Sequence, residues 1–138
     1  MRAVVQRVDT ASVKVNGLKI AQIARGLLVL IGIEKEDNEK DLEYIKNKIL
    51  NLRIFENEQG LFHYSIKDIQ GQILLVSQFT LFGDCKKGNR PSFTGSMPVE
   101  QARAFYPKIV ESFKNNFPET FSGEFQAEME VGVVNNGP

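Results

Sequence analysis

Three polar side chains follow the most apolar strand that the sequence predicts. Residues 73–76, ILLV, form an unbroken apolar run, and Ser77, Gln78 and Thr80 come directly after it. Such a run predicts a strand that is covered on both faces, and the Gly-Asp pair at 83–84 predicts the turn that follows. The end of a buried strand is therefore the place where this protein most plausibly presents chemistry.

Nucleophilic catalysis by one of these hydroxyl groups would need a base within hydrogen-bond distance. His63 is the only histidine of the chain, and its neighbours Leu-Phe-His-Tyr predict a strand rather than a catalytic loop. An ordinary, partly buried histidine is thus favoured over a Ser-His-Asp triad. A nucleophilic pair of Cys85 with His63 has no better support.

Oxyanion stabilisation is the other chemistry open to this strand end. The amide of Gln78, or backbone N–H groups where the strand enters its turn, can donate to an oxyanion, and this role depends on geometry rather than on a pKa. The commoner meaning of Ser77, Gln78 and Thr80 is that they satisfy neighbouring backbone groups. The residue types alone favour that second interpretation.

Composition and charge restrict the class of protein. The 138 residues fit one domain, and 42% hydrophobic and 25% charged residues are ordinary for a soluble globular chain. No apolar run is long enough to span a bilayer or to form a signal sequence, so we expect a cytoplasmic protein. One cysteine indicates neither a disulfide framework nor a CxxC metal site, and nothing in the sequence calls for a metal or another cofactor.

A local basic cluster follows the polar strand end. The formal net charge is zero, which argues against a general attraction to nucleic acid. Lys86, Lys87 and Arg90 lie within five residues of one another, in CKKGNR. A solvated loop is the usual meaning of such a cluster, and phosphate contact is the alternative.

Strand patterns occupy the first third of the chain and several later segments. Residues 1–23 predict a hairpin around Asn16-Gly17, and 27–33 predict a central strand. A short strand pair is expected at 53–62. Alternating apolar residues at 121–134 predict one final strand.

Two helices are expected between these strands. Asp37 or Asn38 can cap the first helix, and Ser96 can cap the second near Pro98, with Pro107 expected to kink or split it. Two helices separated by antiparallel β segments predict an α+β domain. The apolar positions expected to face the sheet are Leu42, Ile45, Ile49 and Leu52 in the first helix and Ala102, Phe105, Ile109 and Phe113 in the second.

Four segments of the chain resemble the D-aminoacyl-tRNA deacylases. They are MRAVVQRV at the start, SQFTL at 77–81, KGNRPSF at 87–93 and MEVGVVNNGP at the end. The family signatures SQxxL and NxGP occur in the expected order, and the match runs through nearly the whole chain. The resemblance implies one α+β domain over residues 1–138, with a barrel-like, mainly antiparallel sheet and two main helices.

The resemblance also implies an activity and a partner. The family hydrolyses the ester that joins a D-amino acid, or glycine, to the terminal adenosine of tRNA, without a cofactor. Its members are homodimers with composite active sites. One subunit contributes the SQxxL segment, here Ser77, Gln78, Phe79 and Thr80, and the other contributes a cis Gly-Pro bond, here Gly137-Pro138.

Further site residues follow from the same resemblance. Arg7 matches the arginine that helps to fix the Gly-Pro segment; the alternative is a strand-end arginine that faces solvent. Asn135 and Met129 are expected at the substrate. Because no base is evident, we expect the 2′-hydroxyl of the tRNA to assist hydrolysis while backbone N–H groups near Phe79 and Thr80 bind the oxyanion. Thr80 as a covalent nucleophile is the alternative.

The end of the sequence departs from the family pattern. The family usually continues for several residues after NxGP, whereas this sequence stops at Pro138. A carboxylate there would place negative charge near the ester and is expected to weaken the dimer or the Gly-Pro conformation. A catalytically silent protein that binds the tRNA end is therefore one alternative, and a plain serine or threonine esterase is another.

Overall fold

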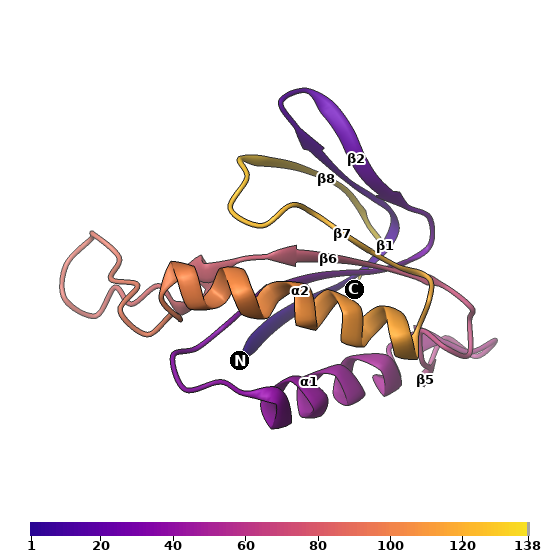
Figure 1. The fold of residues 1–138 in the computed structure, drawn as a ribbon. Coiled ribbons are helices and arrows are strands. Elements are labelled where there is room, and N and C mark those ends of the chain that lie inside the picture. The colour runs from indigo at the N-terminus through magenta and orange to yellow at the C-terminus, as the bar shows by residue number, and fades with distance from the viewer. Residues whose placement is uncertain (138) are drawn as a thin grey trace.

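The computed structural model describes residues 1–137, which form a strongly curved sheet with two helices on one side (Figure 1). The expected α+β class is confirmed. Within residues 1–137, no helix combines the length and apolar character needed to cross a membrane. The elements in chain order are β1 (Arg2–Val15), β2 (Leu18–Ile23), β3 (Gly26–Gly32), α1 (Glu39–Asn51), β4 (Phe55–Glu56), β5 (Phe62–Tyr64), β6 (Gln72–Ser77), the 3-10 helix η1 (Phe79–Phe82), α2 (Val99–Asn116), β7 (Thr120–Ser122) and β8 (Met129–Asn135).

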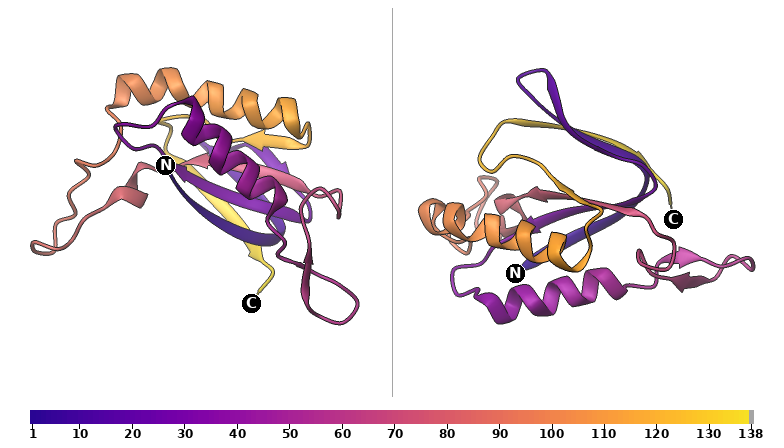
Figure 2. Two further views of the ribbon diagram at one scale, coloured as in Figure 1. Left: turned by 90° about the horizontal axis from the view of Figure 1, so that it is seen from below. Right: turned by 45° about the vertical axis from the view of Figure 1, so that its right-hand side comes forward.

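The long strand β1 gives the sheet its barrel-like shape. Its first half pairs with β3, and its second half pairs with β2 on one edge and with β8 on the other, always antiparallel. The predicted hairpin is confirmed, because Asn16 and Gly17 both have positive φ (50° and 77°), as a type I′ turn requires. Figure 2 shows β1, β2 and β8 curving away from the helices.

Strand β6 lies inside the sheet between β3 and β7 and is parallel to both. Residues 73–76 are at most 1% exposed, which confirms a strand covered on both faces. One face packs against α1 and α2, and the other faces the interior of the curved sheet. The parallel pairing was not predicted: a near-continuous apolar run is typical of strands in parallel sheets, but it does not identify the partner strands of β6.

Helix α1 begins as predicted. Asn38 accepts a hydrogen bond from the Lys40 N–H, and Asp41 completes a capping box. The predicted apolar face is shifted at its end, because Leu50 is buried while Leu52 is 39% exposed. Three of the four predicted positions, Leu42, Ile45 and Ile49, do pack against the core.

Helix α2 differs from the prediction at its start and middle. Ser96 does not cap it, because its hydroxyl donates to the Phe93 carbonyl, and Pro98 occupies the cap position. The helix continues through Pro107 rather than splitting there. The predicted apolar stripe is buried, and this tertiary packing offsets the one backbone hydrogen bond that proline removes. Its buried residues are Ala102, Phe105, Tyr106, Ile109 and Phe113.

The single final strand predicted at 121–134 is wrong. Strand β7 lies parallel beside β6, whereas β8 lies antiparallel beside β1. The connection contains Gln126 with φ 63°, a conformation that ends regular strand geometry. The alternation of apolar residues over 121–134 gives no sign of this break between β7 and β8. The short strand pair predicted before β6 is confirmed as β4 and β5.

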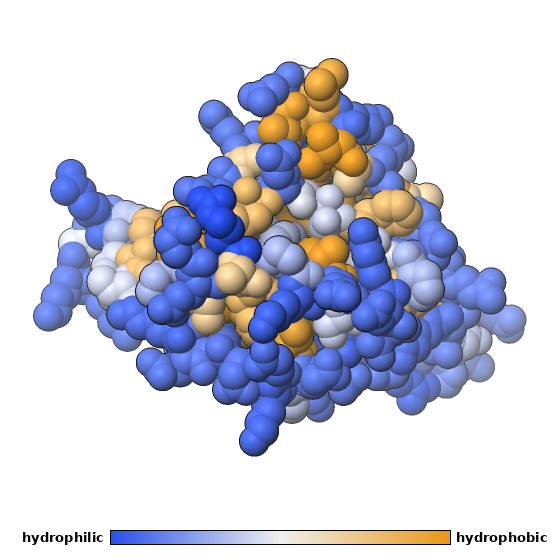
Figure 3. Space-filling model, in the orientation of Figure 1, coloured by the Kyte–Doolittle hydropathy of each residue, from blue (hydrophilic) through white to orange (hydrophobic). Residues whose placement is uncertain are grey.

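An apolar group lies on the surface at the hairpin of β1 and β2. In Figure 3 apolar side chains gather at the top of the molecule, over the hairpin of β1 and β2. Leu18 is 72% and Ile20 is 44% exposed there. Exposed apolar groups of this kind are typical of surfaces that contact another molecule.

Candidate active site

The SQFTL segment forms the end of β6 and the 3-10 turn that follows. Ser77 pairs with Ile31 of β3, and the Gln78 N–H donates to the Ile31 carbonyl at 2.8 Å. The chain then turns into η1, so the predicted turn begins before Gly83. A Cβ atom on Gly32 would lie 3.0 Å from the Gln78 carbonyl oxygen, so this glycine permits the close approach of β3 to the turn.

The side chains of this turn contact each other rather than a base. The Gln78 amide donates to the Thr80 hydroxyl oxygen. Phe79 is 57% exposed and packs edge-on against Phe93, with ring centroids 5.0 Å apart. This bond joins two side chains, so it is not the contact with neighbouring backbone groups that the commoner interpretation expects.

Backbone donors at the start of η1 are free within the described chain. The Phe79 and Thr80 N–H groups donate to no acceptor among residues 1–137, as is usual for the first N–H groups of a helical turn. Arg2, which the sequence analysis did not identify, contacts the second half of the turn. Its Nη1 donates to the Leu81 carbonyl at 3.0 Å, and its guanidinium lies over the Phe82 ring.

His63 lies far from this turn. It is in β5, as a strand residue, but exposed rather than partly buried. Arg53 donates to its carbonyl oxygen at 2.5 Å and lies 3.0 Å from its Nδ1. Figures 1 and 2 place β5 at the opposite end of β6 from the segment after that strand, so a triad of His63 with Ser77 is not assembled.

Arg7 holds the C-terminal segment. Its Nε donates to the Asn136 carbonyl at 3.0 Å and its Nη2 to the Gly137 carbonyl at 2.6 Å. The Asn136 N–H returns a bond to the Arg7 carbonyl at 2.8 Å. With its side chain only 10% exposed, Arg7 does not face solvent. Pro138, and with it the geometry of the Gly137-Pro138 bond, lies outside the described residues.

The other expected substrate residues lie on β8. Asn135 pairs with Val8 of β1, and its side-chain oxygen lies 3.4 Å from the Gln6 amide nitrogen. Met129 is at the opposite end of β8, where its sulfur lies beside Gly123. The length of β8 therefore separates Met129 from the segment that Arg7 holds.

The two expected halves of the site are apart within one chain. Ser77 is level with Ile31, which pairs with Ala3, whereas Arg7 pairs with Leu27. Four residues along β1 correspond to a separation of about 13 Å. The structure thus brings residues 77–80 together in one place and residues 135–137 together in another.

Lys86, Lys87 and Arg90 lie in an exposed loop next to η1. The loop is closed by two backbone hydrogen bonds between Asp84 and Ser92, at 2.8 and 2.9 Å. It projects from the left side of the molecule in Figure 1. The three basic side chains thus share a small surface beside the polar strand end.

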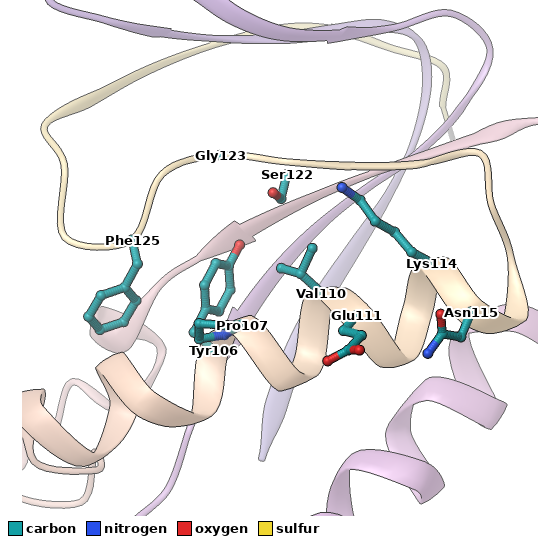
Figure 4. A pocket seen from close by; sticks show the side chains of 9 residues that line it. All are labelled: Tyr106, Pro107, Val110, Glu111, Lys114, Asn115, Ser122, Gly123 and Phe125. Atoms are coloured by element: carbon teal, nitrogen blue, oxygen red, sulfur yellow. The ribbon is translucent and has the colours of Figure 1, made fainter.

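A hollow of about 480 Å³ lies between α2 and the segment after β7 (Figure 4). The Tyr106 hydroxyl donates to the Leu75 carbonyl at 3.2 Å, and burial raises its pKa, so it remains a donor. Phe125 stands beside Tyr106 with ring centroids 5.6 Å apart, and Arg103 lies over the Phe125 ring. No motif marked this hollow in the sequence: its lining residues all lie within 106–125, but the two walls, α2 and the segment from Ser122 on, face each other only in the fold.

The fold and these features define a class: a barrel-like α+β protein with free backbone donors at a strand end and no histidine beside them. The chain belongs to the D-Tyr-tRNA(Tyr) deacylase family, whose model matches residues 4–138.

Individual relatives agree with this assignment. The chain is 49% identical to the D-aminoacyl-tRNA deacylase of Thermosipho africanus, over all of this chain and 93% of that protein. It is 51% identical to the D-aminoacyl-tRNA deacylase of Dictyoglomus turgidum, over all of this chain and 88% of that protein.

Solved structures give the same fold. A structure described as a c-Myc DNA unwinding element binding protein is 48% identical, with a TM-score of 0.94 over 100% of this chain and 94% of that chain. A probable eukaryotic D-amino acid tRNA deacylase has a TM-score of 0.85 over 99% of this chain and 94% of that chain. At 16% identity this second likeness shows the fold alone.

Proposed function

We propose that this protein hydrolyses the ester between a D-amino acid, or glycine, and the 3′-terminal adenosine of tRNA. The observation that carries the proposal is the pair of free N–H groups of Phe79 and Thr80, at an exposed turn with no histidine beside it. The names of the relatives favour turnover over a silent tRNA-end-binding protein. Such an activity belongs in the cytoplasm, where tRNA is charged and used.

Among residues 1–137, no histidine lies at the turn, so the tRNA substrate itself supplies the group that assists hydrolysis. Water attacks the ester carbonyl carbon, and the developing oxyanion accepts hydrogen bonds from the Phe79 and Thr80 N–H groups. The 2′-hydroxyl of the terminal ribose helps to activate the water. The ester C–O bond then breaks, the ribose 3′-oxygen takes up a proton, and the free amino acid leaves. Ser77 and Gln78 shape the wall against which the ester lies.

We further propose that the active site is composite, in a homodimer of single-domain chains. The separation of about 13 Å between the two halves within one chain supports this proposal. A second copy would bring its residues 135–138 against residues 77–80 of the first, with Asn135 flanking the Gly137-Pro138 segment. Met129 then shapes the inner wall from β8.

We also propose that the tRNA end contacts the hollow and the basic loop. The hollow beside Leu75 offers the half-buried Phe125 ring to a flat base, and such stacking contributes about 1–3 kcal/mol per base. The exposed side chains of Lys86, Lys87 and Arg90 would contact the phosphates of the acceptor end.

Hydrolysis of D-tyrosyl-tRNA and L-tyrosyl-tRNA by the purified protein tests the activity. We expect release of D-tyrosine alone. Binding of D-tyrosyl-tRNA without hydrolysis would instead identify a silent RNA-end-binding protein, and cleavage of both esters would identify a plain esterase. A D-tyrosyl-tRNA that ends in 2′-deoxyadenosine tests the substrate assistance, which is wrong if this ester is cleaved at the native rate.

A further inference from the structure

The guanidinium of Arg7 joins two segments that are distant in the sequence. On one side it donates to the carbonyl groups of Asn136 and Gly137. On the other side Nη1 donates to the Ile54 carbonyl at 2.7 Å, and Nη2 donates to Glu56 Oε1 at 3.2 Å. In both views of Figure 2 the segment that follows β8 runs on the side of the molecule where the short hairpin of β4 and β5, which carries Glu56, is found.

The donors of Arg7 are almost fully used in this arrangement. A guanidinium has five N–H groups, and four of them have the acceptors just named. The two N–H groups of Nη2 are divided between Glu56 and Gly137. The position of Nη2, which the Gly137 carbonyl depends on, is therefore also set by the Glu56 carboxylate.

Glu56 also forms the ion pair that balances the positive charge of the largely buried Arg7 guanidinium. The Arg7 side chain is 10% exposed and that of Glu56 is 40% exposed. Among residues 1–137, Glu56 is the only carboxylate within 4.0 Å of the Arg7 guanidinium. The Phe62 ring, 5.6 Å from the guanidinium carbon, covers another side of the charge.

The hairpin that carries Glu56 is itself held in place. Phe55, the neighbouring residue, is fully buried in the core. The Asn57 side chain accepts the N–H groups of Gln59 and Leu61, each at 3.0 Å, and closes the turn. Arg53 bridges to the other strand through the His63 carbonyl. Glu56 is thus presented to Arg7 from a fixed backbone.

We propose that Glu56 is a positioning residue that fixes the Gly137 carbonyl through Arg7 and so sets how strictly D- and L-aminoacyl esters are distinguished. This inference rests on the proposed function, because it needs Gly137 to lie at the substrate. Loss of the carboxylate removes one of the four acceptors that hold the planar guanidinium, so the whole group is held less firmly and the Gly137 carbonyl keeps a donor that is less well fixed. In the proposed site this carbonyl lies where the side chain of an L-amino acid would have to go, as the resemblance to the family implies, so a carbonyl that is less well fixed admits that side chain more readily.

The structural part of the test needs no activity. The Arg7 Nε–H signal is followed by NMR for exchange with water in the wild type, Glu56→Ala, Glu56→Gln and Glu58→Ala. We expect roughly three- to fivefold faster exchange in Glu56→Ala, with Glu56→Gln close to the wild type because its amide oxygen still accepts. Glu58→Ala removes an exposed carboxylate from the same hairpin and serves as the matched control.

The functional part compares hydrolysis of D- and L-tyrosyl-tRNA by the same four proteins. We expect Glu56→Ala to lower the ratio of D to L hydrolysis by roughly three- to fivefold, Glu56→Gln to restore most of it, and Glu58→Ala to leave it unchanged. Equal ratios in all four active proteins, or unchanged Arg7 exchange in Glu56→Ala, would overturn the inference. Inactivity of the wild type itself would instead overturn the proposed function.

Discussion

The hydroxyl group of Thr80 lies beside an amide rather than a base. The Gln78 amide nitrogen can only donate a hydrogen bond, so it occupies a lone pair of Thr80 Oγ1 and removes no proton. His63, the one histidine of the chain, lies at the other end of β6. A nucleophilic role for Thr80 therefore has no protein group to activate it, whereas its backbone N–H remains free to donate.

The first prediction concerns this hydroxyl. Thr80→Ala should lower kcat/KM for D-tyrosyl-tRNA by less than about tenfold, corresponding to about 1.4 kcal/mol, because the backbone N–H remains. Loss of a true nucleophile would cost at least about 10³-fold. Single-turnover hydrolysis separates these outcomes, with Thr80→Ser as the control that keeps the hydroxyl. A loss of the larger size in Thr80→Ala, recovered in Thr80→Ser, would restore covalent catalysis.

The contacts of Arg7 could be predicted only in part from the sequence. Its place in the opening segment marked it as a partner of the C-terminal segment, and the bonds to Asn136 and Gly137 are present. Its contact with Glu56 could not be foreseen, because 49 residues separate the two and nothing local links them. Arg2 was missed for the same reason, since its acceptor is a backbone carbonyl 79 residues away.

At the scale of elements, patterns that depend on near neighbours were predicted well. The Asn-Gly hairpin, the cap of α1 and the buried strand β6 all follow from local rules of backbone and burial. These local rules do not determine which strands pair with each other. The parallel pairing of β6 and the separation of β7 from β8 were therefore missed. Burial of Lys46 also depends on another element, because Ser112 of α2 lies 2.9 Å from its Nζ.

The basic loop after η1 gives the second prediction. Reversing both charges in Lys86→Glu/Lys87→Glu should weaken tRNA binding and reduce the slope of log K against log salt by about 0.7–0.9 for each phosphate that the loop no longer neutralises. Affinities at several salt concentrations measure this. Lys40→Glu/Lys48→Glu on α1 makes the same change of net charge on exposed residues elsewhere. If the two double variants weaken binding equally, the loop makes no specific contact.

The turn that leads into β6 gives the third prediction. The Asp68 carboxylate accepts from the N–H and hydroxyl of Ser65, at 2.8 and 2.7 Å, and the backbone bond is the main reason why its pKa lies below the usual 3.8. A lowered pKa in the folded state means that this stabilisation is present above pH 3.8 and is lost as pH falls through the folded pKa. Asp68→Ala should therefore destabilise the protein at about pH 7.

Denaturant unfolding at a series of pH values measures the effect of Asp68. The difference in free energy of unfolding between wild type and Asp68→Ala should shrink as Asp68 becomes protonated below pH 3.8, toward the difference between Asp68→Asn and Asp68→Ala, because the protonated carboxyl keeps an acceptor oxygen but loses its charge. Asp68→Asn keeps an acceptor oxygen but does not titrate there, so its offset from Asp68→Ala should stay constant. A difference between wild type and Asp68→Ala that is independent of pH would show that the charge contributes nothing.

At the scale of the whole molecule, the central matter is whether the two halves of the proposed active site come from one chain or from two. Residues 77–80 and residues 135–137 occupy positions about 13 Å apart along the sheet. A site that needs both must either bend the chain or use a second copy. The pairing of β8 with β1 along its length resists bending, because its ladder runs from Met129 to Asn135.

Two variants that damage opposite halves of the site can test the composite arrangement. Phe79 is 57% exposed, so Phe79→Asp should damage the wall of the site without unfolding the chain. A Cβ atom on Gly137 would meet nothing within 4 Å among the described residues beyond its chain neighbours. Gly137→Phe should therefore also fold, and its ring would obstruct only the site that Gly137 faces. Each variant alone should have little activity.

The fourth prediction is that co-expression of the two variants restores activity. In a mixed dimer one site contains both substitutions and the other contains neither, so random pairing leaves about a quarter of all sites intact. Hydrolysis of D-tyrosyl-tRNA by the mixture should approach that fraction of the wild-type rate, while separately purified variants stay inactive. If both halves belonged to one chain, every site would carry a substitution, and the mixture would be as inactive as its parents.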